Sequence, residues 1–123
     1  MNIVDSSGWL EYFADSANAK NFSTAIEDTK NLLIPTIILY EVFKKILLEY
    51  GDNQALRIVA HMKQGKVIDI NIELALSAAK LSAELKLPMA DSIILATARK
   101  NNAIIWTQDA DFKGIDKVKF FQK

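Results

Sequence analysis

Short apolar runs alternate along this chain with longer segments in which apolar residues recur every three or four positions. The short runs predict strands at residues 2–4, 32–34, 67–70, 103–106 and 118–121. The periodic segments predict helices at residues 7–15, 18–28, 36–50, 53–62, 72–85 and 89–100. Short strands divided by helices indicate an α/β fold with a central, mostly parallel sheet.

Glycine and proline support several of these boundaries. Gly51 ends the helix at 36–50, and Gly65 follows the helix at 53–62. Pro35 closes the second strand, and Pro88 opens the last helix, because proline suits a first helical turn. No linker, repeat or low-complexity segment interrupts the chain, so residues 1–123 are expected to form one domain.

Composition narrows the class of protein. Half of the residues are hydrophobic, which is enough for a core. The longest uncharged apolar stretch, LLIPTIILY, is shorter than the roughly 20 residues of a membrane span, and Asp5 and Glu11 interrupt any signal-peptide core. The chain has no cysteine, so it has no thiolate metal site. We therefore expect a cytoplasmic protein without a membrane partner.

Two aspartates follow predicted strands. Asp5 comes directly after the first strand, and Asp109 comes just past the fourth. Ligands of open parallel sheets bind beyond the carboxyl ends of the strands, so both acids could share one crevice if these strands are neighbours. Taken alone, Asp5 is explained as a helix N-cap. Since Ser6 and Ser7 can also cap, we predict that the serines cap the helix and that Asp5 remains available for metal.

Two further acids lie on predicted helices. Asp91 shares a helix face with Ile94, Leu95 and Ala98, so it points along an apolar stripe where a carboxylate needs a partner. The helix dipole alone would explain its place along the axis but not its apolar face. Glu41 is explained equally well by a functional role and by a surface pair with Lys45 four residues on.

Together these carboxylates favour a cation site. Packed without a counter-ion they would repel one another, and their pKa values would rise. Oxygen ligands without histidine or cysteine favour Mg²⁺ or Mn²⁺. The net charge of zero does not exclude nucleic acid, because acids held by metal leave the remainder of the chain positive. Candidate phosphate contacts are Lys44, Lys45, Lys113, Lys117 and Lys119, although solubility alone explains any one of them.

Four spaced motifs resemble the PIN-domain ribonucleases, in particular the VapC-like toxins of type II toxin–antitoxin modules. The motifs are VDSSGWLEYF, PTIILYEVFKK, LPMADSIILATA and IIWTQDADF, and the resemblance covers the whole chain. It implies a five-stranded sheet in the order 3-2-1-4-5 flanked by helices, in which the first and fourth strands are neighbours. It also implies that Asp5, Glu41, Asp91 and Asp109 form the catalytic metal site.

The same resemblance implies supporting roles for Ser6 and Thr107, and it leaves Asp111 as an alternative to Asp109. The implied activity is endoribonuclease cleavage in a single-stranded or loop region, such as a tRNA or rRNA loop, with Mg²⁺ or Mn²⁺ as cofactor. The implied partners are a cognate antitoxin, which would place a basic side chain in the acidic site, and a second copy of the chain in a homodimer.

Other functions remain open at this point. A PIN-domain nuclease of RNA maturation or decay would carry the same site. A phosphoacceptor signalling domain would use Asp69, which ends the predicted third strand. In a pure binding module the acids would be structural. His61, the single histidine, has no serine or cysteine nucleophile pattern beside it, so we expect it at or near the surface.

Overall fold

The computed structural model describes residues 1–123 and contains a five-stranded sheet in the order β3-β2-β1-β4-β5, all of whose neighbours are parallel. The predicted sheet order is confirmed. The strands are β1 (Asn2–Val4), β2 (Leu32–Pro35), β3 (Lys66–Ile68), β4 (Ile104–Thr107) and β5 (Val118–Phe120). The third strand ends two residues earlier than predicted, and the fourth continues one residue further.

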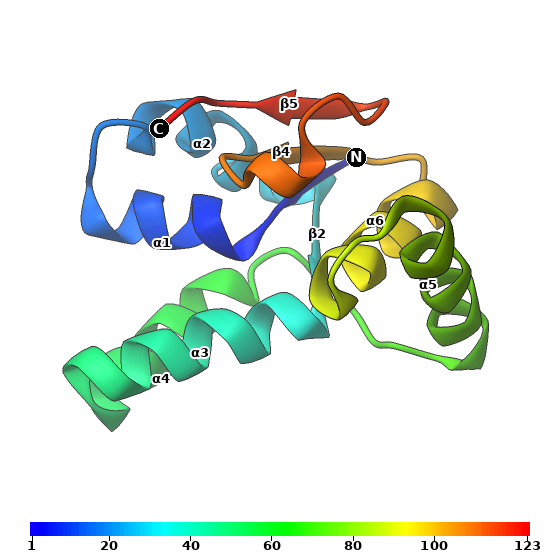
Figure 1. Ribbon diagram of the computed structural model, residues 1–123. Helices are drawn as coiled ribbons and strands as arrows, with labels where there is room; N and C mark the ends of the chain where they lie inside the picture. The colour runs from blue at the N-terminus through cyan, green and yellow to red at the C-terminus, as the bar shows by residue number, and fades with distance from the viewer.

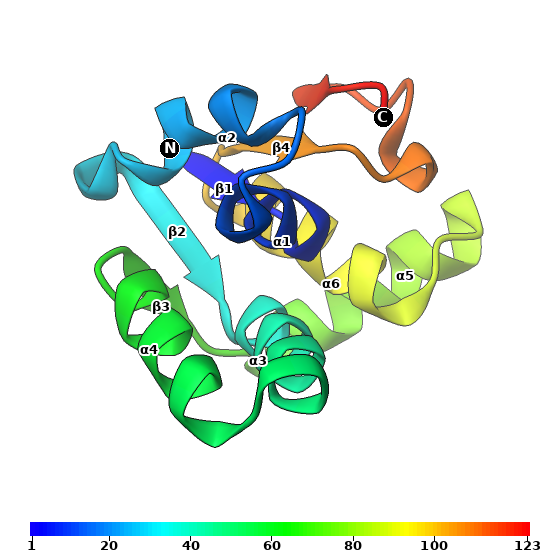
Figure 2. The same cartoon turned by 90° about the vertical axis from the view of Figure 1, so that its left-hand side faces the viewer.

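Six α-helices surround the sheet (Figure 1). They are α1 (Ser6–Ala14), α2 (Ala19–Ile26), α3 (Thr36–Tyr50), α4 (Asp52–Met62), α5 (Ile72–Leu85) and α6 (Met89–Lys100). Two short 3₁₀ turns, η1 (Thr29–Asn31) and η2 (Ala110–Phe112), complete the chain. The α3–α4 pair and the α5–α6 pair lie at different sides of the molecule, as the two views agree (Figures 1 and 2). None of the helices has both the length and the apolar character that a membrane crossing would require.

The core lies where the helices cover the central strands. All four residues of β2 are buried, and α6 is buried continuously from Ser92 to Ala98. Strands buried on both faces read as unbroken apolar runs, which is why the sequence pattern identifies them. Trp9 is fully buried and Trp106 nearly so, and both tryptophans belong to the core.

The register of β1 and β4 positions the carboxyl ends of both strands together. Val4 is paired with Trp106, so the next residues along the two strands, Asp5 and Thr107, lie side by side. The backbone N–H of Asp5 donates to the Trp106 carbonyl at 3.2 Å and extends the ladder by one step. Helices α1, α3 and α6 begin at this edge, and η2 faces their first turns in the middle of the view (Figure 1).

Candidate metal centre

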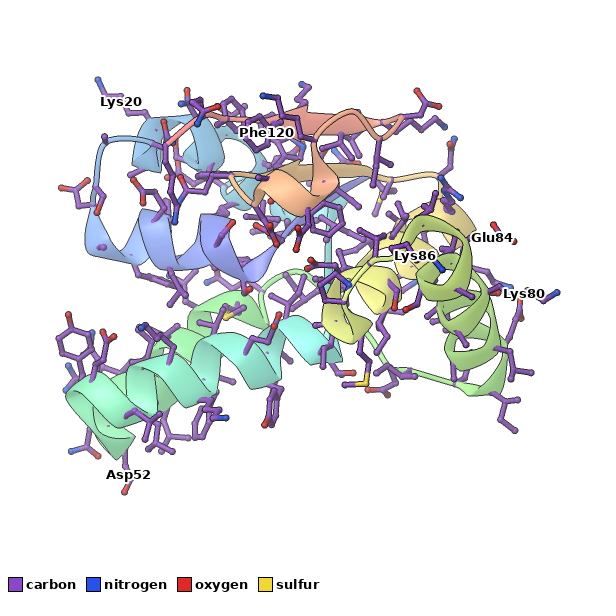
Figure 3. All side chains as sticks on the ribbon, in the orientation of Figure 1. Lys20, Asp52, Lys80, Glu84, Lys86 and Phe120 are labelled. Atoms are coloured by element: carbon purple, nitrogen blue, oxygen red, sulfur yellow. The ribbon has the colours of Figure 1, made fainter.

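Four carboxylates reach one edge of the sheet from four separate elements. Asp5 follows β1, Glu41 lies in α3, Asp91 lies in the first turn of α6, and Asp109 precedes η2. The charge of Asp109 raises the pKa of Asp5, of Glu41 and of Asp91, so the structure brings the four predicted acids into one electrostatic cluster. Side-chain oxygens gather between η2 and the first turns of α1, α3 and α6 (Figure 3). Lys20, Asp52, Lys80 and Glu84, by contrast, extend from the periphery (Figure 3).

Asp5 is the most buried of these acids, at 2 % exposure. Its Oδ1 accepts hydrogen bonds from the Ser7 hydroxyl at 2.7 Å and from the Gly8 N–H at 3.0 Å, and its Oδ2 accepts from the Thr107 hydroxyl at 2.6 Å. Burial raises the pKa of Asp5, the three hydrogen bonds oppose that rise, and the charge of Asp109 adds to it. Both carboxylate oxygens are thereby held in fixed orientations.

The prediction that Ser6 and Ser7 cap the helix and leave Asp5 without a capping role is wrong. Helix α1 begins at Ser6, so both serines lie inside its first turn, and Asp5 itself is the N-cap through its bond to Gly8. The two serines serve the acids instead. Ser7 donates to Asp5, and a contact with the Ser6 hydroxyl lowers the pKa of Glu41. Asp5 therefore caps the helix and contributes to the cluster at once.

Asp91, Asp109 and Asp111 form the tightest group, because one carboxylate oxygen from each lies within 4.8 Å of the others. Burial, followed by the charge of Asp109, raises the pKa of Asp91 to about 8. Hydrogen bonds to Asp109 and Asp111 stabilise the protonated form of Asp91 and are part of that rise. Asp111, the exposed member, stands beside Asp91 together with Asp109, so it is an additional ligand candidate at the same place.

Glu41 is half-buried beside this group. Burial raises its pKa, and the charges of Asp5 and Asp109 add to the rise. The alternative surface pair with Lys45 is wrong, because Lys45 bonds Glu49 at 2.9 Å. Glu41 therefore faces the acids and has no lysine partner.

The donor set fits a hard divalent cation. No lysine, arginine or histidine contributes to the pKa of Asp5, Glu41 or Asp91, so the cluster carries excess negative charge with no protein cation to balance it. Carboxylate oxygens are the protein ligands that Mg²⁺ and Mn²⁺ prefer. A bound cation would stabilise the ionised carboxylates that burial and repulsion now disfavour.

The lysines predicted to contact phosphate lie on different elements. Lys113 immediately follows η2, where its ammonium lies 5.6 Å from the centre of the Phe120 ring. Lys44 and Lys45 are exposed on α3, and the ammonium of Lys44 lies 5.9 Å from the centre of the Tyr40 ring. His61 is exposed on α4 and packs edge-on against Phe13 at 5.4 Å, as its surface interpretation predicts. Asp69 follows β3, which is an edge strand separated from β1 by β2, so it lies apart from the cluster.

Four polar residues beside the site were not predicted as functional. They are Ser7, Glu11, Asn18 and Gln108, which are joined by hydrogen bonds to one another or to Asp5. Ser7 had a signal in the sequence, a hydroxyl two residues after a strand-end aspartate. The other three had none, because 97 positions separate Gln108 from Glu11.

Comparisons with known proteins agree with this fold. A family model described as PIN domain matches residues 3–118. No curated protein matches the chain by sequence. A toxin–antitoxin complex from Klebsiella pneumoniae contains a similar chain, with TM-score 0.84, 23% identity and full coverage of both chains. VapC20 of Mycobacterium tuberculosis, a toxin that cleaves the sarcin–ricin loop, is similar with TM-score 0.78 and 17% identity, over 96% of this chain and 97% of that one.

A third solved structure is DNA-bound VapBC from Salmonella typhimurium, with TM-score 0.76 and 16% identity, over 99% of this chain and 98% of the matched chain. At these identities the structural likenesses support the fold, whereas the family model is matched over most of the sequence.

Proposed function

This chain belongs to the PIN domain family, and from that premise we propose that it is a Mg²⁺- or Mn²⁺-dependent endoribonuclease that acts as the toxin of a toxin–antitoxin pair. The observation that carries the proposal is the convergence of Asp5, Glu41, Asp91 and Asp109 without a protein cation among them. Repulsion and desolvation of these carboxylates destabilise the fold unless a bound ligand offsets them. A divalent cation is the ligand that this donor set fits.

The residues have distinct roles in this proposal. Asp5, Glu41, Asp91 and Asp109 would hold the metal, with Asp111 beside them, and Ser6, Ser7 and Thr107 orient the carboxylates. When bound, the metal supplies Lewis-acid activation of water and charge stabilisation at the scissile phosphate. Lys113, next to η2, would attract phosphates that flank the cut, because the acidic cluster by itself would repel them.

Cleavage of RNA by the purified chain tests the activity. We expect cutting of tRNA or rRNA in Mn²⁺ or Mg²⁺, none in chelator, and none by Asp91→Asn. Asp69→Asn is a matched control, since it removes an exposed aspartate outside the cluster. Cutting that persists in Asp91→Asn, or that is lost in Asp69→Asn, would contradict the proposal. Phosphotransfer from a small phosphodonor onto Asp69 would instead favour the phosphoacceptor alternative.

Toxin action is separable from a role in RNA maturation or decay. We propose a small antitoxin as partner, because solved structures similar to this chain include a toxin–antitoxin complex. A basic side chain from that partner would balance the acidic cluster. Expression in a bacterial host should arrest growth, the arrest should need Asp91, and a cognate antitoxin should relieve it; normal growth with active enzyme would favour RNA processing.

A second copy of the chain is the other partner that we propose. Large apolar side chains remain exposed on α3 and α5, among them Tyr40, Leu48, Ile72 and Leu76. A second copy that covers either helix would remove this apolar surface from water, which favours association. Light scattering at micromolar concentration should give the mass of a dimer, and a monomer mass would contradict this part of the proposal.

A further inference from the structure

Gln108 is a buried amide whose side chain makes no hydrogen bond to Asp5, Glu41, Asp91 or Asp109. It lies between Thr107 and Asp109 and is 7 % exposed. Its Oε1 accepts a hydrogen bond from the Asn18 amide at 2.9 Å, and its Nε2 donates to Glu11 Oε1 at 3.2 Å. Both polar atoms of the side chain are thus used in contacts with α1 and with the turn that follows it.

Glu11 and Asn18 are also bonded to each other, which closes the arrangement. The backbone N–H of Asn18 donates to Glu11 Oε2 at 2.9 Å, so the two oxygens of this one carboxylate hold Gln108 and Asn18 together. We call Glu11, Asn18 and Gln108 the Gln108 clamp. This closed network is partly buried, and breaking one of its bonds leaves a polar atom unpaired, which favours a single arrangement of the three side chains.

The clamp reaches the acidic cluster through short links. The backbone N–H of Gln108 donates to the Ser7 hydroxyl at 3.3 Å, and that hydroxyl donates to Asp5 at 2.7 Å. On one side of Gln108, Thr107 bonds Asp5; on the other side, the Asp109 N–H donates to the Thr107 hydroxyl at 2.9 Å. Fixing Gln108 therefore fixes the segment that carries Thr107 and Asp109.

Electrostatics makes such an anchor useful. The segment after β4 brings Asp109 and Asp111 toward Asp91. Once all three are ionised, as ligands of a cation must be, their like charges repel at this spacing. Without an anchor, repulsion would move this segment outward, and metal binding would have to pull it back. The side-chain hydrogen bonds of Gln108 are made to Asn18 and Glu11, on the side of α1. They therefore leave the carboxylate oxygens of the proposed metal ligands free to bind a cation.

We propose that Gln108, held by Glu11 and Asn18, is a positioning residue that keeps Asp109 and the Thr107–Asp5 pair in metal-binding geometry before the ion arrives. This inference rests on the proposed metal-dependent function. A merely structural role is the competing explanation, since Asn18 also donates to the Gln122 carbonyl at 3.2 Å and so anchors the C-terminal tail. A structural role predicts lower stability with unchanged metal affinity, whereas positioning predicts weaker metal binding in protein that is still folded.

Titration calorimetry with Mn²⁺ alone, on the full chain, separates the two. Gln108→Met keeps the length of the side chain and removes its hydrogen bonds, and Gln64→Met is the matched control because Gln64 is exposed beyond α4. We expect the Kd for Mn²⁺ to rise about tenfold in Gln108→Met, as for other residues that orient metal ligands, and to stay unchanged in the control. In metal-free Gln108→Met, amide hydrogen exchange of Asp111 and Phe112 should also accelerate.

An exchange of the two side chains provides the rescue. In Glu11→Gln with Gln108→Glu, the introduced amide can accept from the Asn18 N–H and donate to the introduced carboxylate, which can accept from the Asn18 side chain. All three bonds of the clamp are then restored, so the Kd should return to within about threefold of wild type, while Glu11→Gln alone should stay weakened. This pair also serves if Gln108→Met fails to fold.

Wild-type affinity in Gln108→Met, or in Glu11→Gln if the former does not fold, would overturn the clamp proposal alone. A wild-type chain that binds no Mn²⁺ would overturn the metal site itself and the clamp proposal with it, so the two failures are distinguishable.

Discussion

The Thr107 hydroxyl donates a 2.6 Å hydrogen bond to Oδ2 of Asp5, although 102 positions separate the two residues. Thr107 is 0 % exposed, and the parallel register of β1 and β4 places the two side by side. The same hydroxyl oxygen accepts from the Asp109 N–H at 2.9 Å. One side chain thus orients Asp5 and the segment that carries Asp109.

Replacing this hydroxyl should cost stability and metal affinity together. Thr107→Val keeps the shape but leaves a buried Asp5 oxygen and the Asp109 N–H without their partner. We expect the free energy of unfolding to fall by about 1–3 kcal/mol in urea titrations, and the Kd for Mn²⁺ to rise. Thr97→Val is the control, because it removes a buried hydroxyl that bonds only the Ile93 carbonyl of its own helix. Equal Mn²⁺ affinity in both variants would contradict the role of Thr107.

The metal-free protein should lose stability as pH rises from about 4 to about 8. The pKa of Asp91 is about 8 in the fold, against 3.8 for the unperturbed group, so in this window the folded state binds a proton that the unfolded state has released. Stability must therefore fall with rising pH, and the raised pKa values of Asp5 and Glu41 act in the same direction. Solvent screens part of the effect, because Asp91 and Glu41 are only half-buried.

Urea unfolding midpoints at pH 5 and pH 8 in chelator measure how stability changes with pH. Saturating Mn²⁺ should reverse it, because ion binding favours the ionised carboxylates and is strongest at high pH. Asp91→Asn should flatten the metal-free slope without any response to Mn²⁺. A wild-type midpoint that is independent of pH in chelator would contradict the electrostatic account of the cluster.

Gly8 tests the packing beneath Asp5. A Cβ added at Gly8 would lie 2.6 Å from Val4 Cγ1 and 2.8 Å from Phe22 Cδ1, and both neighbours are fully buried. Gly8→Ala should therefore destabilise the protein by about 1–3 kcal/mol through overpacking, although alanine is the better helix former. Thermal or urea unfolding measures the change, and Phe22→Leu in the same chain should recover part of it. A more stable Gly8→Ala protein would contradict this account.

Much of the fold could be predicted because its signals are local. The bounds of α3 and α6 agree with the prediction, since Gly51 adopts a φ of 87° after the former and Pro88 precedes the latter. Asp5, Glu41, Asp91 and Asp109 were identified from strand ends, an apolar helix face and the family resemblance, and the structure places all four in one cluster.

What the sequence could not decide was the choice among equivalent partners. Asp5, Ser6 and Ser7 can each cap a helix. Because β1 ends at Val4 and α1 begins at Ser6, Asp5 is the residue that lies at the N-cap position. Lys45 has a glutamate four residues away on either side, and it bonds Glu49. The Gln108 clamp joins segments that only the closed sheet brings together, so no pattern along the chain indicates it.

The two roles of Asp5 can be separated by a pair of substitutions. Asn is as good an N-cap as Asp, so Asp5→Asn should keep the bond to the Gly8 N–H, whereas Asp5→Ala should lose it. In chelator we expect Asp5→Asn to be at least as stable as wild type, because it removes a buried charge, and Asp5→Ala to be about 1 kcal/mol less stable than Asp5→Asn. Both should lose Mn²⁺ binding and RNA cleavage, since neither retains the anionic ligand. Mn²⁺-dependent cleavage by Asp5→Asn at the wild-type rate would mean that Asp5 only caps α1, and the metal would then rest on Glu41, Asp91, Asp109 and Asp111.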